Sequence, residues 1–118
     1  MFRFERLHVW RKAVELYDLA DQIADRLPDR FRFSVADQLR RAALSVSSNI
    51  AEGSGRETVK ECGHFFTIAK SSAFEVVSIV TICQRRGLIT PDAYQEIYRL
   101  SEEICKMLSA LRRHKEKP

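Results

Sequence analysis

Proline, glycine and cysteine are scarce in this 118-residue chain, which has three prolines, four glycines and three cysteines. So few chain-breaking residues suit long uninterrupted helices better than a turn-rich β fold. Cys62, Cys83 and Cys105 are an odd number of cysteines without short spacing. This argues against a disulfide framework and against a zinc site. We therefore expect reduced thiols that pack as small apolar groups.

The sequence also has no long hydrophobic run. Its longest apolar stretch, Val76 to Cys83, is interrupted by Ser78 and Thr81 and is far shorter than the roughly 20 residues that span a bilayer. The first residues contain no apolar core of signal-peptide length. The chain is 45% hydrophobic and 31% charged, which is typical of a soluble globular domain. We expect one domain over residues 1–118, a cytoplasmic location and no membrane partner.

The net charge of +4 is concentrated at the C-terminus. Arg112, Arg113, Lys115 and Lys117 against Glu116 supply +3 of it (four minus one), and the rest of the chain is close to balanced. Cations are favoured at a helix C-terminus for electrostatic reasons alone. The charge by itself therefore favours a nucleic-acid partner only slightly.

Apolar residues recur at alternating steps of three and four in four segments, about 7–27, 34–52, 57–86 and 91–113. Short loops between them make successive helices antiparallel neighbours. The predicted fold is therefore all-α, an antiparallel up-and-down four-helix bundle. The expected core stripes include Val9, Ala13, Leu16, Ala20, Ile23 and Leu27 in the first segment, Val35, Leu39, Ala42, Val46 and Ile50 in the second, and Ile97, Leu100, Ile104, Met107 and Leu111 in the fourth.

The boundaries of these segments carry recognisable start and stop signals. Ser34, followed by Asp37 three residues later, predicts the N-cap of the second helix. Gly53 predicts the position just past its end. Thr90 followed by Pro91 predicts the start of the fourth helix.

The third segment is apolar nearly all round. Phe74, Ile79 and Ile82 lie outside the stripe that contains Cys62, Phe65, Phe66, Ala69, Ala73, Val76, Val77, Val80 and Cys83. A helix with apolar residues on several sides is buried on several sides. One small bundle has too little interior to cover them, so we expect a homo-oligomer.

The sequence contains little that suggests catalysis. Glu61 and His64 form a Glu-x-x-His pair of the kind found in di-iron bundles, but those proteins need a second copy and two further glutamates. No glycine-rich nucleotide loop is present. We expect a non-enzymatic protein with no metal and no cofactor.

The basic residues form three groups: Arg40-Arg41, Arg85-Arg86 and the C-terminal segment from Arg112. The candidate nucleic-acid ligands are Arg40, Arg41, Arg112, Arg113 and Lys115. These clusters contain no interleaved aromatic residues for stacking. Binding of RNA or DNA would then depend on phosphates and be weak and independent of sequence. The alternative is a scaffold whose partner is another protein.

Residues 37–53, together with Leu7-His8-Val9-Trp10, go beyond periodicity. The run from Gln38 through Arg41-Ala42 and Ser45 to Asn49-Ile50-Ala51-Glu52-Gly53 resembles the small proteins encoded in intervening sequences of bacterial 23S ribosomal RNA genes. Gly55-Arg56, His64-Phe65, Ile68-Ala69, Ser72 and Glu75 fit the same family.

The resemblance implies an antiparallel four-helix bundle assembled into a ring, with a homopentamer as the expected state. It also implies kinship with the accessory variability determinant of diversity-generating retroelements, a basic pentamer that binds nucleic acid and a reverse transcriptase. The resemblance thus implies nucleic acid or, as the alternative, another protein as the partner, besides other copies of the chain itself.

The polar residues of this run also have a structural interpretation. Asn49 and Glu52 lie near the end of the second helix, where they are expected to satisfy backbone groups or to pair with Arg40, Arg41 or Arg56. Arg40, Asn49, Glu52 and Arg56 are therefore the predicted polar network, which would fix the register of the helices.

Overall fold

The three- and four-residue spacing of apolar side chains produces four α-helices in a computed structural model of the chain. The helices are α1 His8–Arg26, α2 Val35–Ser54, α3 Val59–Arg85 and α4 Pro91–Glu116. The structure describes the backbone of residues 1–116 and the side chains of residues 1–112, and no strand occurs among these residues. The all-helical fold is therefore confirmed. The largest difference from the expected ranges is at α4, which continues to residue 116 instead of 113.

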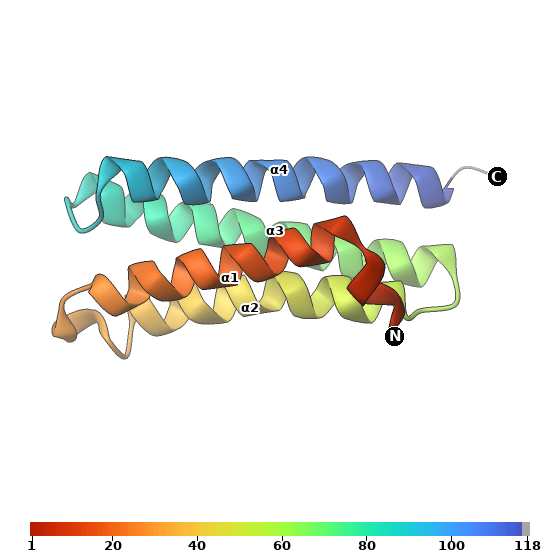
Figure 1. Cartoon of the computed structure of the whole chain (residues 1–118), viewed down its shortest axis with the longest axis horizontal. Helices are drawn as coiled ribbons and strands as arrows, with labels where there is room; N and C mark the ends of the chain where they lie inside the picture. The colour runs from red at the N-terminus through yellow and green to blue at the C-terminus, as the bar shows by residue number, and fades with distance from the viewer. Residues whose placement is uncertain (117–118) are drawn as a thin grey trace.

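Successive helices run antiparallel and form a rod of 49 × 21 × 21 Å (Figure 1). Each helix packs against its neighbours in the chain, and α4 closes the bundle against α1. The α1–α2 and α3–α4 connections lie at one end, which we call the loop end. The start of α1, the α2–α3 connection and the end of α4 lie at the other, which we call the terminal end (Figure 1).

The predicted stripes form the core. All six residues of the α1 stripe, from Val9 to Leu27, are buried, as are four of the five in α2. Val35, the exception, lies half-buried in the first turn of its helix. In α4 the core contains Leu108, which the sequence analysis did not include. Met107 and Leu111 are only partly buried and pack on its edge.

Gly53 lies inside α2 and does not end it. The helix continues to Ser54, and Gly55 is its C-cap. A Cβ atom on Gly53 would lie 2.9 Å from Phe65 Cβ and 2.9 Å from Phe66 Cε1. Glycine is required here because α3 starts very close to the last turn of α2. The predicted helix end was therefore wrong by two residues.

Two of the helix starts differ in how they are capped. Thr90 Oγ1 accepts a hydrogen bond from Ala93 N at 3.2 Å, which confirms the predicted cap of α4. Ser34 was expected to cap α2 but makes no such bond, because its hydroxyl is directed back to the Phe31 carbonyl. The preceding 3-10 helix η2, Asp29–Phe31, sets this backbone geometry. At the end of α3, Gly87 has a φ of 69°, the left-handed conformation that glycine adopts most readily.

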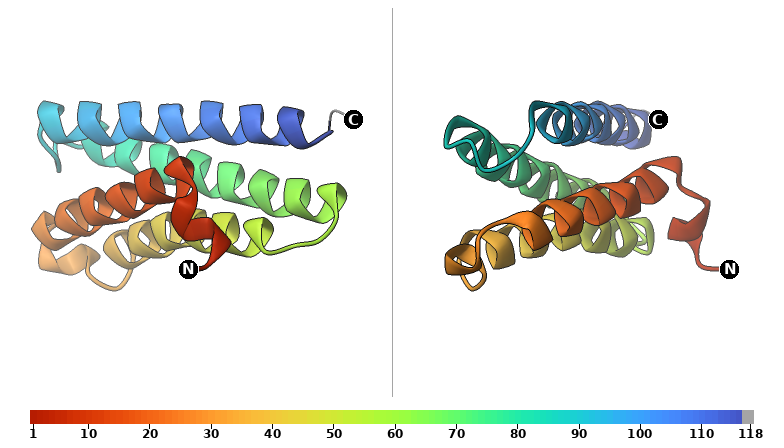
Figure 2. Two further views of the ribbon diagram at one scale, coloured as in Figure 1. Left: turned by 45° about the vertical axis from the view of Figure 1, so that its right-hand side comes forward. Right: turned by 60° about the vertical axis from the view of Figure 1, so that its left-hand side comes forward.

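The 3-10 helix η1, Arg3–Arg6, folds back beside the end of α2 (Figures 1 and 2). Arg3 Nη1 donates a hydrogen bond of 3.0 Å to the Ser54 carbonyl. Carbonyls of the last helical turn have no partner within the helix. The first residues of the chain thus complete the last turn of α2.

Apolar residues of α3 outside the core stripe reach the surface. Phe74 is 61% exposed and Ile82 is 55% exposed. By length and composition alone, α3 is long and apolar enough to cross a membrane. The prediction of no membrane partner was based on the short Val76–Cys83 stretch and not on the whole of α3. The core helix of a soluble bundle passes the same test, so the absence of a membrane partner stays a prediction.

Candidate nucleic-acid interface

Arg40, the first predicted phosphate ligand, is held by two carboxylates of α1. Its Nε lies 2.7 Å from Asp21 Oδ1, and its Nη2 lies 2.7 Å from Asp25 Oδ1. The two aspartates are four residues apart, so one guanidinium reaches both. The hydrogen bond with Asp21 raises the pKa of Arg40 despite some loss of solvation. This arginine joins α1 to α2 and is already neutralised.

Arg41 and the C-terminal cations lie in different places. Arg41 Nη2 is 3.1 Å from Asp37 Oδ2 within α2, and its side chain is 75% exposed. Arg112 extends across Gly63 of α3 and donates a hydrogen bond to Thr67 Oγ1. Arg113 and Lys115 lie in the last turns of α4, and their side chains are outside the described residues. The five predicted ligands therefore do not form one surface: two lie on α2 and three at the terminal end.

The predicted polar network is replaced by separate contacts. Arg40 binds aspartates of α1 instead of Asn49 or Glu52. Asn49 Nδ2 donates to the Ser45 carbonyl at 2.8 Å and to Ser45 Oγ at 3.0 Å, so the part of the hypothesis that assigned it to backbone groups agrees with the structure. The Arg56 guanidinium lies over the Phe65 ring, 4.6 Å from its centroid. Arg40, Asn49 and Arg56 therefore contact different partners and do not contact one another in a single network.

Polar contacts between α2 and α3 are made by other residues. Ser45 Oγ lies 2.8 Å from Ser72 Oγ, and Gln38 Nε2 donates to Glu75 Oε2 at 2.7 Å. Because Asn49 also binds Ser45, three side chains form a short chain of hydrogen bonds across this interface. Small residues allow the close approach that these bonds require.

Five arginines without a carboxylate partner lie in or beside the two connections at the loop end. Residues 26–34 and 84–92 contain five arginines and two aspartates. Among the described residues, none of these arginines forms an ion pair. They are Arg26, Arg30, Arg32, Arg85 and Arg86, all exposed.

Aromatic side chains alternate with these arginines in the α1–α2 connection. The Arg30 guanidinium lies 4.7 Å from the centroid of the Phe31 ring, and that of Arg32 lies 5.6 Å from the Phe33 ring. Phe31 packs on the core, whereas Phe33 is 88% exposed. This segment contains no two adjacent basic residues, so it was not among the three predicted basic groups. The alternation Arg-Phe-Arg-Phe is the signal that identifies it.

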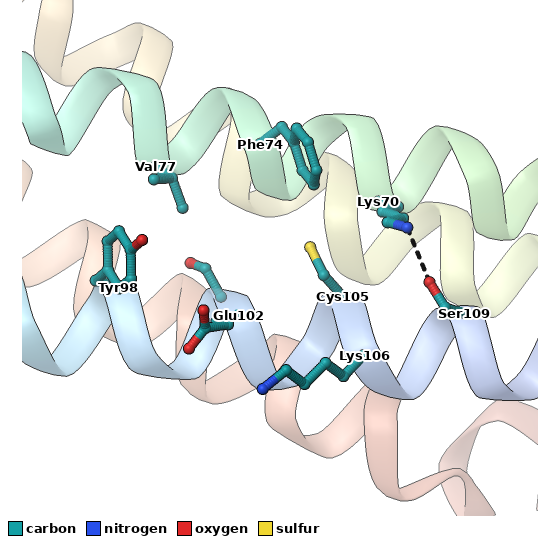
Figure 3. A pocket seen from close by; sticks show the side chains of 9 residues that line it. Lys70, Phe74, Val77, Tyr98, Glu102, Cys105, Lys106 and Ser109 are labelled. Carbon is teal, nitrogen blue, oxygen red and sulfur yellow. Dashed lines mark hydrogen bonds between the residues drawn. The ribbon is translucent and has the colours of Figure 1, made fainter.

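A groove of about 430 Å³ runs between α3 and α4 on the side of the bundle (Figure 3). Phe74 from α3 and Tyr98 and Cys105 from α4 line it. Lys70 Nζ donates to Ser109 Oγ at 2.8 Å across one end. Burial raises the pKa of the Cys105 thiol, and nearby Lys70 opposes this only in part. Such a half-buried, protonated thiol is a poor nucleophile.

No three histidine, cysteine, aspartate or glutamate side chains are grouped for metal binding among the described residues. His64 is exposed and packs edge-on against Phe65, with ring centroids 5.6 Å apart. The structure therefore does not add further ligands to the Glu61–His64 pair.

Comparison with known proteins identifies the family. A protein of unknown function from the S23 ribosomal protein family of Bacteroides thetaiotaomicron has the same fold, with a TM-score of 0.82 and 24% identity over 88% of this chain and 97% of its own. No curated protein matches the sequence. The sequence model of the 23S rRNA-intervening sequence protein family matches residues 5–110, and the chain therefore belongs to this family.

Proposed function

We propose that this chain is a non-enzymatic subunit of a homo-oligomeric ring, most simply a pentamer, that binds nucleic acid through phosphate contacts without sequence preference. The observation that carries the proposal is the group of five exposed arginines at the loop end. Arg40 and Arg41, the predicted ligands on α2, are paired with carboxylates. Arginines at the loop end are not paired among the described residues.

Several exposed arginines at one end provide the positive charge that a phosphate backbone requires. Binding to phosphates releases counterions and depends on the number of cations brought to the backbone. A single copy offers few, but a ring would repeat the same end around a common axis. The basic C-terminal segment beginning at Arg112 would supply a second set at the terminal end.

The apolar surface of α3 supports the assembly. Phe74 and Ile82 are exposed, and the grooves beside them are lined by further apolar residues. One groove lies between α3 and α4, and the other, of about 320 Å³, is lined by Val35, Ile79 and Ile82. Exposed apolar patches of this kind commonly mark protein interfaces.

The groove between α3 and α4 favours a second candidate function. Phe74 and Tyr98 present aromatic surface beside Lys70 and Lys106, a composition typical of protein-binding sites. In this alternative the bundle is a scaffold for another protein and has no nucleic-acid role. We place either function in the cytoplasm, which agrees with the free thiols of Cys83 and Cys105.

Binding to generic RNA and DNA tests the proposal. The full chain is titrated into a labelled single-stranded RNA and a labelled duplex at low and at moderate salt concentrations. Affinity that falls steeply with salt for both probes supports phosphate binding. The absence of binding at low salt, together with nuclease-resistant capture of a protein partner from cells, would favour the scaffold.

A further inference from the structure

The two connections at the loop end bring residues far apart in sequence to one surface. Residues 27–34 join α1 to α2, and residues 86–90 join α3 to α4 (Figures 1 and 2). The bundle is 21 Å across in both short directions. Arg30 and Arg32 in the first connection and Arg85 and Arg86 at the start of the second therefore lie at the same end of the rod.

Phe33 is the most exposed large hydrophobic side chain in the described part of the protein, at 88%. It lies between Arg32 and Ser34 in a turn anchored by Phe31, whose side chain packs on the core. The Arg32 guanidinium lies 5.6 Å from the centroid of the Phe33 ring. A turn anchored by Phe31 thus presents one aromatic ring together with a cation, and four more arginines lie at the same end of the rod.

Each part of this surface matches a component of single-stranded nucleic acid. An exposed ring stacks with an unpaired base of any type, and arginine binds phosphate and also stacks on bases. The bases of a duplex are stacked on one another and do not offer a free face, so a duplex uses only the cations. At roughly 3.4 Å per stacked nucleotide, a strand of about six nucleotides crosses the end of the rod.

We infer that the loop end is a stacking site for single-stranded nucleic acid, in which a base packs on Phe33 while Arg30, Arg32, Arg85 and Arg86 hold the flanking phosphates. This inference rests on the proposed nucleic-acid function and adds a preference for unpaired strands. It also moves the principal site away from Arg40 and Arg41, whose charges are already paired.

The test compares matched probes and matched variants of the full chain. Fluorescence anisotropy measures binding to a labelled oligo-uridine strand of about ten nucleotides and to a duplex of the same length. Phe33→Ala should weaken single-strand binding about tenfold, the effect of one lost stacked base, and leave duplex binding unchanged. Phe33→Trp should preserve single-strand binding. Phe33→Leu, which keeps apolar surface but has no ring, should behave like Phe33→Ala.

Phe2 provides the control for position. It is 73% exposed and neighbours Arg3, whose side chain binds the Ser54 carbonyl at the terminal end. Phe2→Ala should leave binding to both probes unchanged. Circular dichroism should show the same melting temperature for each variant, since an exposed ring contributes little to the free energy of unfolding.

The outcomes separate this inference from the proposed function. Equal binding of strand and duplex, with no effect of Phe33→Ala, overturns the stacking site and leaves phosphate binding intact. No binding of either probe at low salt overturns both. If Phe33→Ala instead reduces the mass measured by light scattering, the ring packs against another copy of the protein and the stacking site is wrong. If Phe33→Leu binds the single strand like the native chain, an aromatic ring is not needed and the stacking site is also wrong.

Discussion

Arg40 Nε and Asp21 Oδ1 lie 2.7 Å apart and join the N-terminal third of α2 to the C-terminal half of α1. The same guanidinium binds Asp25 one turn further along α1. An arginine held in this way contributes to the packing of two helices and has little capacity left for a phosphate. Its replacement should therefore affect stability more than binding.

We expect Arg40→Ala to lower the free energy of unfolding by about 1 kcal/mol, as for a partly exposed, hydrogen-bonded ion pair. Its side chain is only 28% exposed. Arg41→Ala is the control, because its contact with Asp37 lies within one helix and should be worth about 0.3 kcal/mol. Urea denaturation of both variants measures the difference. Equal losses of the free energy of unfolding would show that the Arg40 contact between α1 and α2 stabilises the protein no more than the Arg41 contact within α2.

Gly53→Ala should destabilise the protein by about 2 kcal/mol, because its methyl group would overlap with Phe65 and Phe66. Gly55→Ala is a close control: its Cβ would meet only backbone oxygens at 3.6 and 3.9 Å, and its φ of −89° suits any residue. That substitution should be neutral or slightly stabilising. Thermal melts compare the two. A stable Gly53→Ala variant would mean that α2 and α3 separate easily at this end.

Cys105 should react slowly with iodoacetamide at neutral pH, because burial raises the pKa of its thiol above the ordinary 9.0. A raised pKa in the folded state means that the stability it contributes is complete below pH 9.0 and is lost as the pH rises through the folded value. Timed alkylation followed by mass spectrometry measures the rate. Cys105→Ala should reduce the loss of melting temperature above pH 9. Labelling as fast as a free thiol at pH 7 would contradict the buried position.

Phe74→Asp should disrupt the assembly by placing a charge on the exposed face of α3. The native chain should have a mass several times 13.7 kDa in light scattering at micromolar concentration, and the variant a smaller one. Since Phe74 is 61% exposed in a single copy, the bundle itself should remain helical by circular dichroism. A native chain that is monomeric would rule out the ring.

Replacing Arg112, Arg113 and Lys115 by alanine should weaken binding to all nucleic-acid sequences alike. Each lost phosphate contact on a single strand reduces the slope of log affinity against log salt by about 0.7. Titrations at several salt concentrations measure that slope. Arg41→Ala serves as the control, because Asp37 already neutralises its charge. An unchanged slope would show that the C-terminal segment does not touch the backbone and would leave the loop end as the principal site.

The helices and their buried stripes follow from the sequence because a three- and four-residue spacing of apolar residues places them on one face of a helix, and that face is the one buried. The α1 stripe from Val9 to Leu27 needed no knowledge of its partners. Gly53 could not be interpreted in the same way, since its role depends on how close α3 lies. Ser34 shows a similar limit: the 3-10 turn before it turns its hydroxyl away from the helix.

The candidate site was harder to predict than the fold. Arg40 and Arg85 look alike in sequence, and only the tertiary structure shows that Arg40 meets two aspartates of another helix. Charge pairs between helices have no fixed spacing along the chain. The alternating Arg30 to Phe33 segment, in contrast, was visible in the sequence, but the exposure of Phe33 could be determined only from the fold.

The chain enters α1 and leaves α4 at the terminal end of the rod, opposite the two connections. This polarity makes the protein simple to orient on a surface. A chip or bead attached through the end of α4 holds every copy upright, with the Phe33 turn facing the solution. Attachment through a cysteine introduced in the α3–α4 connection would invert the rod and cover that turn. The difference in nucleic-acid capture between the two orientations shows which end of the rod binds nucleic acid, without a substitution in the site itself.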